Sequence, residues 1–85
     1  MFSSFIMGLA SATLIELGVI EDPLTKKRRV QKDMAQQHIQ ILTMIEEKTR
    51  GNLTSDEREL LERVLRDVKM AFAKAASTPT FKETK

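Results

Sequence analysis

The sequence predicts an all-α protein in which an apolar N-terminal helix precedes a long antiparallel helical hairpin, giving three helices per chain. Two long segments carry apolar residues at the three- and four-residue spacing that buries one side of a helix. Glycines stand at positions 18 and 51, where helical patterns break off, and glycine commonly terminates helices. The run Thr-Ser-Asp-Glu at 54–57 has the composition of a capping box, the most specific local signal in the chain.

The first predicted helix is apolar around its whole circumference. It runs from Ser4 to about Leu17, with Ser3 or Ser4 as its N-cap and Gly18 as its stop. Its large apolar residues point in every direction around the helix axis. A helix that is apolar all round must be buried all round, so we expect this helix to need cover on more than one side.

The two further helices are predicted from their apolar stripes. The second runs from about Val30 to Arg50 and the third from Thr54 to about Ala76. The connection between them is so short that the two helices must lie antiparallel. The stripe of the second helix consists of Met34, His38, Ile41, Leu42 and Ile45, and that of the third of Leu61, Val64, Val68, Ala71 and Ala75.

The chain is expected to form one helical domain over residues 1–76, followed by a flexible polar tail over residues 77–85. Asp22-Pro23 forces an extended or turn conformation on the connection between the first two helices. The apolar N-terminal run lacks the basic residues of a signal peptide and is too short for a comfortable membrane span. We therefore predict no membrane span, and the absence of cysteine is compatible with a cytoplasmic location.

The composition argues against catalysis and against nucleic-acid binding. The chain has no cysteine and one histidine, so it offers neither a thiolate nor a histidine cluster for a metal. No catalytic residue, cofactor site or metal site is predicted, and we expect the protein not to be an enzyme. The formal net charge is +2 with both signs mixed, and tryptophan and tyrosine are absent, so nucleic acid is a disfavoured partner.

Self-association is the function that the sequence favours. A chain of this length buries only about 60% of its unfolded surface, and small domains usually need disulfides, a metal or oligomerisation for stability. Two amphipathic helices can cover one side of the first helix but hardly both, so we expect a core shared in a homodimer, with any other protein partner unidentified. A row of small residues, Ser4, Gly8 and Ala12, permits close approach of another backbone. The residues predicted to form the interface are Phe2, Phe5, Ile6, Gly8, Leu9, Ala12 and Ile15.

An alternative function attaches to the dense charge run Lys26, Lys27, Arg28 and Arg29. This run is a candidate anion-binding site that could attract nucleic acid, acidic lipid head groups or an acidic protein. We favour the interpretation that it is a solvated loop, because no second basic patch and no aromatic platform support it.

His38 and Glu16 are ionisable residues placed among apolar residues of the predicted helices. His38 lies in the middle of the second stripe, and we expect a packed core residue there; the alternative is a small ligand carrier or enzyme built around it. Glu16 interrupts the first helix. It either reaches solvent at the helix end or forms a buried ion pair with a lysine or arginine of another helix.

Three stretches of the sequence carry a family resemblance when taken together: FIMGLAS from Phe5, the pair Asp22-Pro23, and EKTRGNLT from Glu47. Together they resemble a family of short bacterial proteins known only as a domain of unknown function, over about residues 2–72. The turn of that family tends to carry a glycine soon after the proline, where this chain has Lys26. The resemblance implies a bacterial cytoplasmic protein and supplies no activity.

Overall fold

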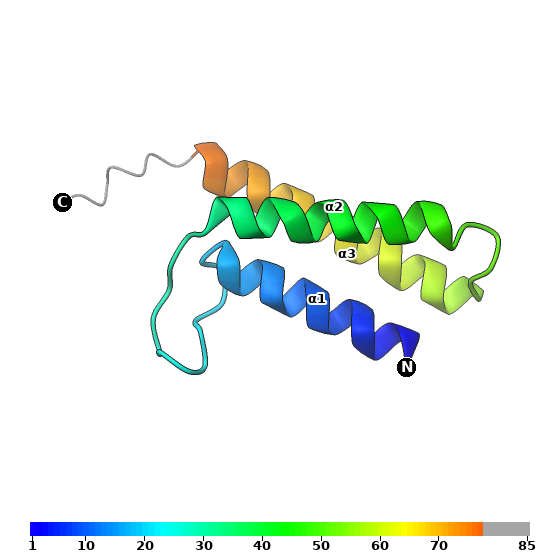
Figure 1. Cartoon of the computed structure of the whole chain (residues 1–85), viewed down its shortest axis with the longest axis horizontal. Coiled ribbons are helices and arrows are strands. Elements are labelled where there is room, and N and C mark those ends of the chain that lie inside the picture. The colour runs from blue at the N-terminus through cyan, green and yellow to red at the C-terminus, as the bar shows by residue number, and fades with distance from the viewer. Residues whose placement is uncertain (78–85) are drawn as a thin grey trace.

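The computed structural model describes residues 1–77, with side chains as far as Ala75. It contains three helices, α1 (Phe2–Glu16), α2 (Lys32–Lys48) and α3 (Ser55–Ser77), and each helix packs against the other two. Figure 1 shows α2 and α3 as an antiparallel hairpin with α1 lying along it. The predicted all-α class and three-helix architecture are confirmed. The predicted tail lies outside the described residues, except for Ser77, which ends α3.

The start of α1 differs from the prediction. The helix begins at Phe2 with Met1 as its N-cap, so the predicted cap at Ser3 or Ser4 is wrong. Met1 makes no side-chain capping bond; its backbone carbonyl instead accepts the N–H of Phe5 at 3.0 Å. Phe2 packs against the core cluster, and this contact explains why the helix extends beyond the serines.

The end of α1 confirms the predicted stop at Gly18. This residue has a φ of 78°, in the left-handed region that favours glycine. Its N–H donates to the carbonyl of Ile15 at 3.1 Å, and the N–H of Val19 donates to the carbonyl of Leu14 at 2.9 Å. This pair of bonds is a Schellman motif, and it satisfies carbonyls that the end of a helix would leave unpaired.

The connection between α1 and α2 is a loop whose ends lie side by side. Leu17 and Val30 form an isolated antiparallel bridge, and the N–H of Gln31 donates to the carbonyl of Glu16 at 2.6 Å. The loop therefore leaves and rejoins the bundle at one point, which Figure 1 shows at the end opposite the α2–α3 turn.

The α2–α3 junction confirms the predicted capping box. The Thr54 hydroxyl accepts the N–H of Glu57 at 3.1 Å, and the Glu57 carboxylate accepts the N–H of Thr54 at 2.9 Å. Gly51 has a φ of 85°, which turns the chain before this cap. The two signals together set the short turn that makes the hairpin antiparallel.

The core lies where the three helices meet. Its buried members are Ile6, Ala10, Leu42, Leu61, Val64, Leu65 and Val68. The stripe predicted for α3 is confirmed at its first three positions, whereas that of α2 is rotated: Met34 is 45% exposed and Ile41 is 39% exposed. Ala35 is fully buried instead. The reason is that α2 contacts both other helices, so its buried side is centred on Ala35 and Leu42.

Within residues 1–77, none of the helices has the combination of length and apolar character that crossing a membrane requires.

Candidate interaction surfaces

One side of α1 is buried and the opposite side is open. Ile6, Ala10 and Thr13 are buried against the hairpin. Ser4, Gly8 and Ser11, on the other side of the helix, are exposed. A Cβ atom placed on Gly8 would meet no atom of α2 or α3 within 4 Å, so this position leaves open space beside α1. Ala12, the third member of the predicted row of small residues, is half-buried.

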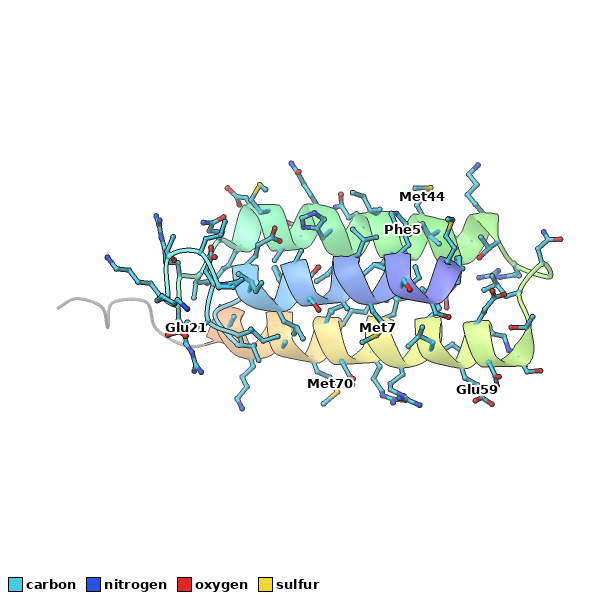
Figure 2. The ribbon with its side chains drawn as sticks, turned by 90° about the horizontal axis from the view of Figure 1, so that it is seen from below. Phe5, Met7, Glu21, Met44, Glu59 and Met70 are labelled. Carbon is cyan, nitrogen blue, oxygen red and sulfur yellow. The ribbon has the colours of Figure 1, made fainter. Side chains whose placement is uncertain are left out.

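Large apolar side chains flank this open row. Phe5 is 55% exposed and Met7 is 49% exposed. Figure 2 shows that Phe5 lies on the side of α1 nearer α2, the helix that carries Met44, and that Met7 lies on the side nearer α3. Residues 1–15 include no charged side chain. We call this surface the α1 face, defined by Ser4, Phe5, Met7, Gly8 and Ser11 of α1 together with Ile41 and Met44 of α2.

The residues predicted for the dimer interface divide between the core and the α1 face. Ile6 is fully buried inside the chain, and Phe2 and Leu9 pack against the core. Phe5 and Gly8 are exposed. Ala12 and Ile15 are half-buried. The sequence pattern did not identify Met7 and Met44 as members of the same surface, because that requires the rotation of each helix to be known.

His38 of α2 and Glu16 of α1 form a partly buried polar contact between helices. The imidazole Nδ1 lies 2.7 Å from Glu16 Oε1, and the two side chains are 22% and 13% exposed. An ionised carboxylate only accepts hydrogen bonds, so the contact places a proton of the imidazole on Nδ1. Neither alternative considered for Glu16 was right, because its partner is the histidine rather than a lysine or arginine.

This contact predicts a specific stability effect. We expect His38→Leu to lower the free energy of unfolding by about 1–3 kcal/mol, because Glu16 is left as a partly buried acceptor without a donor. The double variant Glu16→Leu/His38→Leu should recover most of that loss, since both polar groups are then removed. Urea denaturation measures each value, and Gln37→Leu, at an exposed position of α2, is the matched control. Equal stability of the single and double variants would contradict the role of the pair.

The candidate anion-binding residues lie in the α1–α2 loop. Lys26, Lys27, Arg28 and Arg29 are all exposed. None of their side chains forms an ion pair or hydrogen bond with another group of residues 1–77. The structure therefore leaves all four charges available to an external anion.

The same loop carries exposed aliphatic side chains that the sequence did not single out. Leu24 is 90% exposed, Val30 53%, Val19 50% and Ile20 39%. The signal that could have identified Leu24 is its position directly after Asp22-Pro23, since a turn tip has no neighbouring element to cover it.

A cleft of about 250 Å³ lies between the loop and the C-terminal end of α1. Two carboxylates, Glu16 and Asp22, and two cations, Lys27 and Arg29, line it together with uncharged residues. Because the charges balance and Glu16 already binds His38, the lining specifies no ligand. In the part of the chain that the structure describes, no three metal-ligating side chains come together.

Comparison with known proteins relates the chain to a sequence family. The sequence model of a family described as a domain of unknown function (DUF1844) matches residues 1–74. The resemblance seen in the sequence is thus confirmed at the level of a family of unknown function. No curated protein matches the chain, and no solved structure matches it.

Proposed function

The chain belongs to the DUF1844 family, which supplies no activity, and we propose from its exposed surfaces that it is a non-catalytic helical module that forms a homodimer. The observation that carries this proposal is the α1 face. A helix with no charged side chain from Phe2 to Ile15, with Phe5 55% exposed and Met7 49% exposed on either side of an open glycine, is costly to leave in water.

A second copy of the chain is the occupant that best fits this surface. A two-fold contact brings the same patch of each copy together, so the patch must complement itself. The α1 face meets this condition because it has no charge to repel its own copy, and because Gly8 and Ser4 allow two backbones to approach closely. A partner recognised through charge would find no counterpart in residues 1–15.

The size of the surface indicates which helices take part. A 15-residue helix is about 22 Å long, and its outward side alone provides less than the roughly 800 Å² that each partner buries in a typical stable complex. The contact therefore includes α2 at Ile41 and Met44. We expect the dimer to form at micromolar concentrations rather than to be inseparable from folding, because each chain already has its own core.

Sedimentation equilibrium tests this proposal directly. The wild-type chain should sediment as a dimer at tens of micromolar and dissociate on dilution. Phe5→Ser/Met7→Ser should weaken association at least tenfold, because each large apolar side chain lost from an interface costs about 1.5–3 kcal/mol. The control Met70→Ser changes a side chain that is 64% exposed on the outer edge of α3, and it should have no effect (Figure 2). A wild-type chain that stays a folded monomer at tens of micromolar would disprove the dimer.

A further inference from the structure

The α1–α2 loop presents apolar and basic side chains together at one end of the bundle. Leu24 is 90% exposed at the tip, and Val19, Ile20 and Val30 are exposed on the arms. The four consecutive cations at 26–29 lie in the same loop, which contains only two carboxylates, at positions 21 and 22. We call residues 19–30 the apolar–basic loop. Figure 2 shows Glu21 within it, beyond the ends of the helices.

The tip of this loop is held in place by the backbone. The N–H of Asp22 donates to the carbonyl of Lys27 at 2.9 Å, and the N–H of Lys26 donates to the carbonyl of Asp22 at 2.7 Å. The Asp22 carboxylate accepts the N–H of Leu24 at 2.8 Å, so part of the acidic charge is engaged inside the turn. A turn closed in this way keeps Leu24 pointing outward, and less ordering is needed when it binds.

We propose that the apolar–basic loop attaches the protein to an anionic phospholipid surface. Leu24 inserts among the acyl chains just below the head groups, and Lys26 to Arg29 lie against the lipid phosphates and carboxylates. An aliphatic anchor beside a basic cluster supplies the two signals that reversible membrane attachment requires. This attachment is separate from dimerisation, because the loop and the α1 face involve different residues.

The side chains of the loop favour lipid over nucleic acid. A nucleic acid would use the cations, but it offers nothing that covers four exposed aliphatic side chains. Residues 19–30 contain no aromatic side chain on which a base could stack. A lipid surface satisfies both halves of the loop, because its interior accepts Leu24 and its head groups accept the cations, and it needs no pocket shaped for either.

Co-sedimentation of the full chain with vesicles tests this proposal. We expect binding to phosphatidylcholine vesicles that contain phosphatidylserine, and little binding to phosphatidylcholine alone. Leu24→Ser should reduce the partition coefficient by at least about tenfold, the loss expected for one aliphatic side chain. Lys27→Gln/Arg28→Gln/Arg29→Gln should reduce it by about a hundredfold, at roughly fivefold for each cation near an anionic surface.

Two controls separate this attachment from general effects. The control Arg63→Gln/Arg66→Gln/Lys69→Gln also removes three exposed cations, but from α3, and it should retain most of the vesicle binding. Met70→Ser removes an exposed apolar side chain from α3 and should also bind normally.

The proposal is overturned if no variant of the loop alters binding, if wild type does not bind, or if Leu24→Ser binds as wild type does. Binding to duplex DNA or single-stranded RNA that depends on the cations but not on Leu24, without vesicle binding, would identify a nucleic-acid site instead. Sedimentation equilibrium without lipid reports the dimer independently, so either proposal can fail alone.

Discussion

Replacing Gly8 with leucine is expected to dissociate the homodimer while each chain stays folded. No atom of α2 or α3 lies within 4 Å of where a Cβ atom on Gly8 would be, so a side chain can extend into solvent in the monomer without a clash. Glycine is also a poor helix former, and leucine should stabilise α1 by up to about 1 kcal/mol. In the dimer, the same side chain would occupy the space that the partner backbone needs, and the helices would be forced apart.

This opposite effect on folding and on association makes Gly8→Leu a sharp test. Thermal unfolding followed by circular dichroism should give an unchanged or raised midpoint, measured at a concentration where wild type is monomeric. Sedimentation equilibrium should show a monomer at tens of micromolar, a loss of affinity of at least tenfold. The control Ala73→Leu adds the same side chain at an exposed position of α3, and it should dimerise like wild type. Unaltered dimerisation of Gly8→Leu would mean that α1 does not lie at the interface.

Leu42→Ala should have the largest effect on stability. Leu42 is fully buried in α2, at the meeting point of the three helices, and it belongs to the core cluster. Truncating a buried leucine to alanine costs about 2–5 kcal/mol, because apolar contact is lost and a cavity remains. A domain of this size has a stability near the low end of the usual range of about 5–15 kcal/mol, so this change removes a large fraction of it.

Urea denaturation of monomeric protein measures this loss. The adjacent residue Ile41 provides the matched control, because it is of similar size but 39% exposed. Ile41→Ala should cost much less in the free energy of unfolding. Since Ile41 belongs to the α1 face, the same variant should also weaken dimerisation, whereas Leu42→Ala should act mainly through folding. Equal losses of stability for the two variants would contradict the rotation of α2 described above.

The features that could be predicted from the sequence are those encoded by neighbouring residues. The capping box at Thr54 and Glu57 is a contact between residues three apart, and both of its hydrogen bonds are present. The Gly18 stop is equally local. The stripe of α3 was predicted well because its strong apolar residues, Leu61, Val64 and Val68, lie together on one side of the helix.

The features that could not be predicted depend on how helices are rotated and aligned. The apolar residues of α2 cover a wider part of the helix circumference than the part that is buried. The neighbouring sequence does not indicate that Ala35 rather than Met34 faces the core. The partner of Glu16 depends on the register between α1 and α2, since His38 is 22 residues away in sequence. The outward position of Leu24 depends on backbone bonds across the turn. Lys26 has a φ of 62° in this turn, a value that favours glycine. The family that the sequence resembles tends to carry a glycine at this point of the turn.

Because the apolar–basic loop lies at one end of the bundle, the relative direction of the two α1 helices in the dimer decides whether both loops can reach the same membrane. If the two α1 helices pair in parallel, both Leu24 tips face the same surface, and the second tip binds from a high effective concentration. Avidity of this kind can raise apparent affinity by about 10²–10⁴ without any new contact. If the helices pair antiparallel, the tips point in opposite directions, and one dimer can bridge two vesicles. Vesicle clustering would therefore distinguish an anchor on one membrane from a tether between two.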